Sequence, residues 1–370
     1  MIPVYVPVIG KEEINFVNDA LRKGQLSGTY GDYITDFENE FATYSGCKYG
    51  IAVSNGTNAL HLSIAAANIK PGDEVLLSAS TNIATALCIV HNGGIPVPVD
   101  SEEGTWNLNV NLVEKLITKK TKAIIPVHLF GHPVKMDELM KIAKKYNLKV
   151  IEDCAESHGA MFKKKMTGSF GHMACYSFYA NKIITTGEGG MIVTNNKKLA
   201  EKLKLLRNLG FTKPRFKHHI KGFNFRMTGY QAAMGLAQTR KLNEIVNKKR
   251  LIASTYYKYL HSVKGLGLPI EKSWAKNVYW VYAIEVRPEF GVSRDKLMSK
   301  LEQANIETRT FFCSMADQPC LKKVKGFKKK STPVARRIWK SGLYLPSSLN
   351  LSESNIKFIS DTIINIKNNK

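Results

Sequence analysis

The stretch Tyr49-Gly50-Ile51-Ala52-Val53-Ser54-Asn55-Gly56-Thr57-Asn58-Ala59-Leu60 indicates the fold class, because an apolar run ends in a glycine turn from which a helical pattern begins. From about Tyr49 to Asn195, short runs rich in Val and Ile alternate with longer helical patterns. This alternation is typical of βα units repeated around a mostly parallel sheet. We therefore expect an α/β fold whose ligands lie at the carboxyl ends of the strands.

The expected elements of this region can be placed by residue number. Strands are expected at 50–53, 74–78, 96–99, 123–127, 150–153, 174–178 and 191–194, and helices at 58–67, 136–146 and 198–205. The alternation then stops, and a long helical stretch at 229–260 is followed by a strand at 278–286 and helices at 294–304 and 353–366. This pattern predicts a large domain, residues 1–240, and a smaller mixed α/β domain, residues 241–370.

Composition narrows the class of protein. A chain of 370 residues with 44% hydrophobic content can bury a large core and carry a second domain. The first residues lack the basic and apolar pattern of a secretion signal, and no run is long enough for a membrane span, so we expect a cytoplasmic protein without a membrane partner. The six cysteines are scattered without the paired spacing of a zinc or redox site, which predicts reduced thiols and no metal.

The formal net charge of +24 has two functional interpretations, nucleic-acid binding and attraction of a small polyanionic substrate. The basic clusters are dispersed, and none belongs to a helix-turn-helix, zinc-finger or RNA-binding motif. We therefore expect no nucleic-acid partner. A solvated basic surface, produced by a composition rich in Lys, Asn and Ile, is the alternative explanation for most of the charge.

Two neighbouring segments carry the densest chemical information, residues 151–159 (IEDCAESHG) and 175–190 (CYSFYANKIITTGEGG). In them Asp153 ends an expected strand and Lys182 lies in a polar turn flanked by glycines. Pyridoxal phosphate needs such a pair, an amine that forms an imine with it and an anion that keeps its pyridine nitrogen protonated. A lone lysine is more often a surface charge and a lone aspartate is often a helix cap, so the pair alone leaves structural roles open.

The turn at residues 54–60 offers a third component. Backbone amides at the expected helix start, together with the Thr57 hydroxyl, are a suitable cradle for a dianionic phosphate. Glycine-containing turns between strand and helix are common, so this turn gains weight only beside the other two segments.

In this order, the three segments resemble the DegT/DnrJ/EryC1/StrS family of sugar aminotransferases, most closely its GDP-perosamine synthase branch. Further segments extend the resemblance over nearly the whole chain: 24–28 (GQLSG), 126–133 (PVHLFGHP), 222–227 (GFNFRM), 306–309 (IETR) and 342–347 (GLYLPS). The resemblance implies the type I pyridoxal-phosphate aminotransferase fold, with a mostly parallel central sheet flanked by helices and a smaller mixed α/β C-terminal domain.

The resemblance implies a role for each matching residue. Lys182 should hold pyridoxal 5'-phosphate covalently, release it when an amino donor arrives, and then move the proton between the substrate carbon and the cofactor carbon. Asp153 should pair with the pyridine nitrogen. Glu156, where many family members have Gln, should lie near the ring hydroxyl.

The remaining cofactor contacts concern the phosphate and the ring face. The resemblance implies that Gly56, Thr57 and Ser177 hold the phosphate and that Asn224 completes this site from the neighbouring subunit of a homodimer. Family members commonly stack an aromatic residue on the ring where this chain has Asn82, whose amide offers less contact area. Substrate contacts are implied for Ser27, His158, Asn181 and Arg309.

The implied reaction is transamination. Glutamate gives its amino group, pyridoxamine phosphate is the intermediate form, and the acceptor is the C4 ketone of a nucleotide-linked 4-keto-6-deoxy sugar, first of all GDP-4-keto-6-deoxymannose. A UDP-linked or dTDP-linked sugar, or another small phosphorylated ketone, is the alternative acceptor. Branches that dehydrate the sugar at C3 replace the lysine by histidine, and Lys182 argues against that reaction. The set Lys182, Asp153 and Thr57 argues against a non-catalytic binding or regulatory protein of the same fold.

Overall fold

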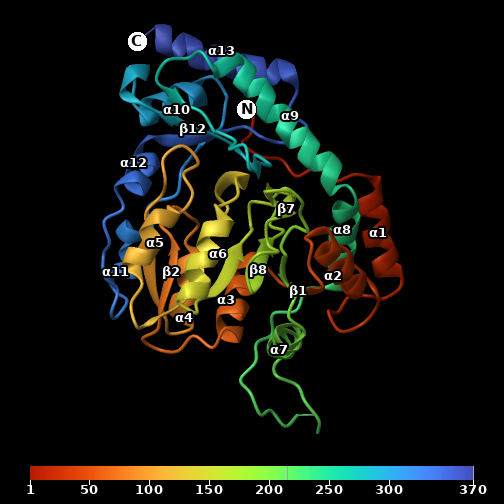
Figure 1. The fold of residues 1–370 in the computed structure, drawn as a ribbon. Coiled ribbons are helices and arrows are strands. Elements are labelled where there is room, and N and C mark those ends of the chain that lie inside the picture. The colour runs from red at the N-terminus through yellow and green to blue at the C-terminus, as the bar shows by residue number, and fades with distance from the viewer. Residues whose placement is uncertain (215, 370) are drawn as a thin grey trace.

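The computed structural model describes residues 1–214 and 216–369 and centres on one large sheet with the strand order β1-β9-β8-β5-β4-β2-β3 (Figure 1). Its strands are β1 (Tyr49–Val53), β2 (Glu74–Ser78), β3 (Ile95–Val99), β4 (Thr121–Ile125), β5 (Lys149–Asp153), β8 (Met173–Ser177) and β9 (Gly190–Thr194). Neighbouring strands pair in parallel, except that β9 runs antiparallel to both β1 and β8. The expected α/β class with a mostly parallel sheet is confirmed.

Helices cover both faces of this sheet because successive strand residues point to opposite sides. The helices are α3 (Gly56–Ala66), α4 (Ala84–His91), α5 (Val110–Leu116), α6 (Met136–Lys145) and α7 (Lys197–Arg207). On one face Leu76 and Ile124 form an apolar cluster with residues of α5 and α6, and on the other face Val75 and Ile125 cluster with residues of α3, α4 and α7. Each fully buried Leu or Ile contributes about 1.5–3 kcal/mol to this packing.

The long helical stretch expected at 229–260 is two helices, α8 (Gly229–Arg240) and α9 (Leu242–Leu260). Lys241 interrupts them with φ −97° and ψ 1°. The two helices have different packing partners, since α8 contacts α1 (Lys11–Arg22) and α2 (Tyr33–Tyr44), whereas α9 contacts α13 (Glu353–Asn368). The break lets each helix follow its own surface, which a continuous apolar period does not reveal.

A second, antiparallel sheet has the order β10-β12-β14-β13 and lies above the central sheet in Figure 1, beside α9 and α13. Its strands are β10 (Leu266–Gly267), β12 (Tyr282–Val286), β13 (Arg309–Thr310) and β14 (Gly342–Leu345). Smaller elements are β6 (Met161–Phe162), β7 (Lys165–Met166), β11 (Ala275–Lys276), α10 (Arg294–Gln303), α11 (Pro319–Lys322) and α12 (Pro333–Ser341), and the 3-10 turns η1 (Leu129–Gly131), η2 (Pro288–Phe290) and η3 (Met315–Asp317). The expected boundary after residue 240 falls at the α8–α9 break, and the division into two domains stays a prediction.

None of the helices in the described part of the chain is both long enough and apolar enough to cross a bilayer.

Candidate active site

A cavity of about 690 Å³ lies between the two sheets, at the carboxyl ends of β5 and β8. Eight of the residues expected in the site line this cavity: Gly56, Thr57, Asn82, Asp153, Ser177, Asn181, Lys182 and Arg309. The opposite wall comes from the C-terminal part of the chain, through Trp280, Phe312 and Tyr344. Ligand sites of open α/β sheets lie at this edge, so the position of the cavity agrees with the fold.

Lys182 lies in the loop between β8 and β9. The loop is closed at its base, because the Phe178 N–H donates to the Gly189 carbonyl over 2.8 Å and the Thr186 N–H donates to the Phe178 carbonyl over 2.9 Å. Burial lowers the pKa of the Lys182 amine, while the nearby Glu156 and Asp153 carboxylates raise it in part. The loop therefore presents an amine with an increased tendency to be neutral, as a nucleophile requires.

Asp153 is the last residue of β5 and is only 4% exposed. Its carboxylate accepts a hydrogen bond from the Thr85 hydroxyl over 2.8 Å and another from the Ala155 N–H over 3.1 Å. Burial raises the pKa of this carboxyl group, and the two hydrogen bonds oppose the change. A cation that lies against Asp153 is stabilised by a fixed negative charge in a site shielded from water. This suits a protonated pyridine nitrogen.

Gly56 begins α3 and packs directly against Ser177 of β8. A Cβ atom on Gly56 would lie 2.6 Å from the Ser177 Cβ, so only glycine lets the helix start approach this hydroxyl. The preceding Asn55 accepts the Asn58 N–H over 2.8 Å as the N-cap, and the first helical N–H groups have no intrahelical partner. These amides, with the Ser177 and Thr57 hydroxyls at the cavity wall, fit a phosphate group.

Three further expected residues line the cavity, and their side chains differ in the hydrogen bonds and ion pairs that they form. The Asn181 Oδ1 atom is buried and has no hydrogen-bond partner among residues 1–214 and 216–369. Arg309 is about half exposed and forms an ion pair with Glu307 over 3.2 Å. The Asn82 Oδ1 atom accepts the N–H of Ala84 over 3.0 Å, so this side chain already supports the start of α4.

Glu156 lies behind the cavity wall instead of in its lining. It is 3% exposed, and its carboxylate accepts the Phe130 N–H over 2.8 Å. Burial raises the pKa of Glu156 to about 7, although Lys182 and the Phe130 N–H lower it. The expected contact with the ring hydroxyl of the cofactor stays a prediction.

The expected contact of His158 with substrate stays a prediction, and the residue lies outside this chain's own cavity lining. The residue is fully buried outside the cavity lining, and rings of Phe41, Tyr176 and Phe178 surround its imidazole at centroid distances of 5.1–6.2 Å. Burial lowers its pKa to about 3, so the imidazole is neutral. An apolar environment of this kind supports packing and keeps the ring from the cavity surface.

Ser27 and Asn224 also lie outside this chain's own cavity lining. Ser27 is exposed, and its hydroxyl lies 2.7 Å from the Thr29 hydroxyl, so the single chain brings it to no substrate site. Asn224 is exposed and forms an isolated bridge with Asn208. The expected contribution of Asn224 to a neighbouring subunit stays a prediction.

Sequence reasoning missed several residues of the site, and two of them contact Asp153 or Lys182 directly. Thr85 lies in the first turn of α4 and supports Asp153, but a threonine near a helix start gives no distinctive pattern. Trp280 comes from the segment before β12 and holds Lys182 from the opposite wall. Trp280 lies 98 positions after Lys182, so no local signal could have identified this contact.

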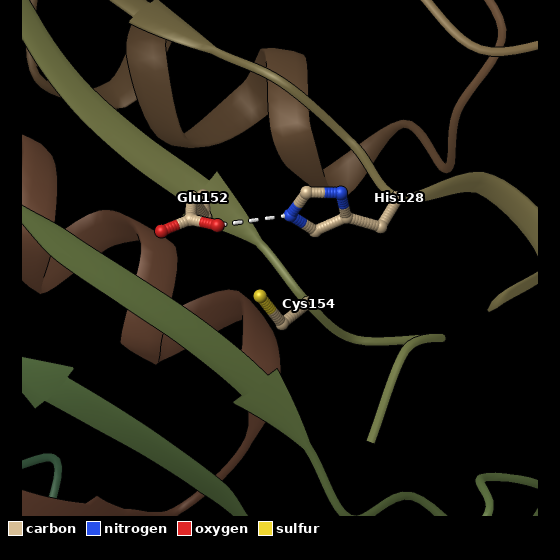
Figure 2. A group of neighbouring side chains, drawn as sticks. All are labelled: His128, Glu152 and Cys154. Atoms are coloured by element: carbon tan, nitrogen blue, oxygen red, sulfur yellow. Dashed lines mark hydrogen bonds and ion pairs between the residues drawn. The ribbon is translucent and has the colours of Figure 1, made fainter. Parts of the chain in front are cut away.

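Figure 2 shows His128, Glu152 and Cys154, whose ligand-type atoms lie within 4.8 Å of one another. The His128 Nδ1 atom accepts the Val134 N–H over 3.0 Å, so Nε2 carries the proton and donates to Glu152 over 3.1 Å. The Glu152 carboxylate also accepts the N–H groups of Gly168, Phe170 and Gly171. Hydrogen bonding alone accounts for this buried cluster, and we propose no metal there.

Together the fold and the cavity define a pyridoxal-phosphate aminotransferase. The amine, the buried anion and the helix start converge on one cavity, and the unpartnered Asn181 oxygen leaves an acceptor for a ligand. The chain belongs to the DegT/DnrJ/EryC1/StrS aminotransferase family, whose model matches residues 7–364. Pyridoxal phosphate is therefore its cofactor.

Comparison with individual proteins gives the degree of similarity. The chain is 39% identical to the GDP-perosamine synthase of Escherichia coli O157:H7 over 363 residues, which covers 98% of this chain and 97% of that protein. It is 35% identical over 305 residues to the dTDP-3-amino-3,4,6-trideoxy-alpha-D-glucose transaminase of Streptomyces venezuelae, covering 81% and 79%. The solved structure of S. venezuelae DesV in complex with a ketimine intermediate superposes with a TM-score of 0.90 at 31% identity, covering 96% and 94%.

Proposed function

We propose that this enzyme transfers an amino group from glutamate to the C4 ketone of GDP-4-keto-6-deoxymannose, giving GDP-perosamine. The observation that carries the proposal is the convergence of Lys182, Asp153 and the start of α3 on one cavity. The similarity to GDP-perosamine synthases over nearly the full length of both chains supports this choice of sugar.

Each residue at the cavity then has a chemical role. When bound, pyridoxal phosphate supplies a carbonyl that carries the amino group and a ring that accepts the electrons of a substrate carbanion. The Lys182 amine, whose pKa burial lowers, accepts the proton from the substrate carbon and returns it. The Asp153 carboxylate holds a positive charge on the ring nitrogen. The N–H groups of Gly56 and Thr57 bind the phosphate.

The substrate side of the cavity contains polar groups from both parts of the chain. Arg309 reaches the lining from β13, and its guanidinium suits a substrate phosphate. The unpartnered Asn181 oxygen is an acceptor for a sugar hydroxyl. The strong positive charge of the chain favours the approach of a polyanionic nucleotide sugar. These contacts support a nucleotide-linked acceptor. As part of the same proposal, the enzyme is a cytoplasmic homodimer that serves surface-polysaccharide biosynthesis.

A dTDP-linked keto-sugar is the second candidate acceptor, because a transaminase named for such a substrate is 35% identical. The cofactor-facing segments carry most of the resemblance, and they contact the nucleotide least. The choice of nucleotide therefore needs a direct measurement.

Steady-state kinetics with glutamate and a panel of GDP-, UDP- and dTDP-linked 4-keto-6-deoxy sugars tests the proposal. We expect the highest kcat/KM with GDP-4-keto-6-deoxymannose and a product aminated at C4. A clear preference for a UDP- or dTDP-linked sugar would overturn the GDP assignment, and no turnover with any member of the panel would remove the nucleotide-sugar proposal. Replacing glutamate by glutamine in parallel tests the donor.

A further inference from the structure

Two aromatic side chains from outside the βα region hold the backbone at the reactive lysine. The Trp280 indole N–H donates to the Asn181 carbonyl over 2.6 Å. The Tyr5 hydroxyl donates to the Lys182 carbonyl over 2.5 Å. Both carbonyls flank the Cα atom of Lys182, so these two bonds fix the direction in which its side chain leaves the loop.

Trp280 also contacts the amine itself. The Lys182 Nζ atom lies 4.2 Å from the centroid of the Trp280 ring, within the distance of a cation–π contact. Trp280 is 3% exposed, and its backbone N–H donates to the Phe130 carbonyl over 3.0 Å. The Phe130 ring lies nearly parallel to it at 6.5 Å. The tryptophan is therefore itself immobilised before it contacts the lysine.

The segment around Tyr5 is also held in place, by groups from three separate parts of the chain. The neighbouring Val4 N–H donates to Glu307 over 2.9 Å, and the Val6 N–H donates to the Ser348 hydroxyl over 2.7 Å. The buried Lys249 amine of α9 lies 5.4 Å from the centre of the Tyr5 ring. The N-terminal segment thus spans from the second sheet to the Lys182 loop.

The indole face opposes the effect of burial on the Lys182 amine. Removing an ammonium group from water favours its neutral form, whereas the negative face of an aromatic ring favours its charged form. The other charged or titratable groups near this amine are the carboxylates of Asp153 and Glu156, which favour the ammonium form, and His158, which burial keeps neutral. Trp280 therefore favours the ammonium form without carrying a charge itself.

We propose that Trp280 and Tyr5 are positioning residues for Lys182. Trp280 provides a fixed resting place for the amine over its ring and, through its N–H, orients the preceding peptide group, while Tyr5 orients the following one. This inference rests on the proposed role of Lys182 as the reacting amine. According to this inference, two residues that are remote from Lys182 in sequence determine the direction of its amine and influence its ionisation.

Competitive trace acetylation of the cofactor-free full-length chain tests the effect on ionisation. Acetylation of the Lys182 peptide, measured by mass spectrometry across pH, gives the pKa of its amine without any need for turnover. We expect Trp280→Leu to lower that pKa by about 0.5, since a cation–π contact contributes about 0.5–1 kcal/mol. Trp280→Phe keeps a ring face and should retain most of the wild-type pKa. Trp274→Leu, a tryptophan outside the cavity lining that packs on Phe162, is the matched control and should change nothing.

The effect on orientation is measured separately, as the rate at which the chain binds added pyridoxal phosphate covalently. We expect Tyr5→Phe to slow this step about fivefold while leaving the pKa of Lys182 unchanged, because one hydrogen bond contributes about 1 kcal/mol. Tyr257→Phe, an exposed tyrosine on α9, is the control.

An unchanged pKa in Trp280→Leu, or an equal fall in Trp274→Leu, would overturn the role of Trp280. A wild-type rate in Tyr5→Phe would overturn the role of Tyr5. Failure of the proposed role of Lys182 as the reacting amine looks different, since borohydride would then fix no cofactor on Lys182 of the wild-type chain.

Discussion

The hydroxyl of Thr85 on α4 donates a 2.8 Å hydrogen bond to the carboxylate of Asp153 at the end of β5, across 68 residues of sequence. Thr85 is fully buried, and its hydroxyl lies 3.0 Å from the Thr81 hydroxyl. The bond favours the charged form of Asp153 where burial favours the neutral form. The anion at the floor of the cavity therefore depends on a hydroxyl from a different element of the fold.

Replacing Thr85 by Val should weaken cofactor binding without unfolding the chain. The substitution keeps the shape of the side chain and removes the donor, so the pKa of Asp153 should rise further. A hydrogen bond to a charged group contributes about 1.5–3 kcal/mol, which predicts a loss of affinity for pyridoxal phosphate of roughly tenfold or more. Absorbance titration of the cofactor measures it. Thr85→Ser keeps the hydroxyl and should bind pyridoxal phosphate as tightly as the wild type. Equal affinity of Thr85→Val and Thr85→Ser for the cofactor would contradict the prediction.

Glu156 should make stability depend on pH. Its pKa in the folded chain is about 7, above the ordinary value of 4.5, so the folded chain holds a proton that the unfolded chain releases. The resulting stabilisation is complete below about pH 4.5 and is lost as pH rises through 7, and it amounts to at most about 3 kcal/mol. Glu156→Gln should therefore gain stability relative to the wild type at about pH 8 and not at about pH 4.

Urea unfolding of the cofactor-free chain at the two pH values measures this difference. The exposed Glu289 offers the matched control, and Glu289→Gln should show no such pH dependence. A constant difference between Glu156→Gln and the wild type across pH would show that folding does not change the pKa of Glu156.

Gly56→Ala should separate packing from phosphate binding. The new Cβ atom would lie 2.6 Å from the Ser177 Cβ, and overpacking of this kind costs about 1–3 kcal/mol of unfolding free energy. Adding Ser177→Gly removes the clash, so the double variant should recover most of the stability. The double variant lacks the Ser177 hydroxyl, so its affinity for pyridoxal phosphate should remain below that of the wild type. Recovery of both properties together would argue against Ser177 as a phosphate contact.

Lys182→Ala should retain pyridoxal phosphate noncovalently and lose turnover. The contacts at Gly56, Thr57 and Asp153 remain when the amine is removed. Loss of the proton-transfer group alone lowers the rate by roughly 10²–10⁴-fold. Borohydride reduction of the wild type should attach the cofactor to the Lys182 peptide. Mass spectrometry that finds it on another lysine, or an alanine variant with most of its activity, would show that the assignment is wrong.

Mixing two inactive variants tests whether Asn224 acts in the neighbouring subunit. If the sites are shared, a heterodimer of Lys182→Ala and Asn224→Ala chains contains one intact site, and random mixing should restore roughly a quarter of wild-type activity. A mixture of Lys182→Ala with Asp153→Asn should restore none, because both residues act in their own chain. Absence of activity in the first mixture would place Asn224 in its own subunit or outside the site.

Local sequence patterns were sufficient for the βα half of the molecule. The central strands and the three expected helices, α3, α6 and α7, begin and end within two residues of their expected positions, because the period of the apolar residues directly reports which side of each element is buried. The shorter helices α4 and α5 were not expected. The same patterns could not detect the break at Lys241, since α8 and α9 keep a helical period while changing packing partners. They also could not show that aromatic rings surround the His158 imidazole.

The sequence by itself determined which chemistry this protein performs, because Asp153 and Lys182 lie in segments whose residues are specific to one family. Only the tertiary structure decided how that chemistry is supported. Thr85, Trp280 and Tyr5 reach these two residues from 68 to 177 positions away. Such contacts depend on how the second sheet and the N-terminal segment pack over the first sheet, and packing is a sum over many distant pairs that no short stretch of sequence contains.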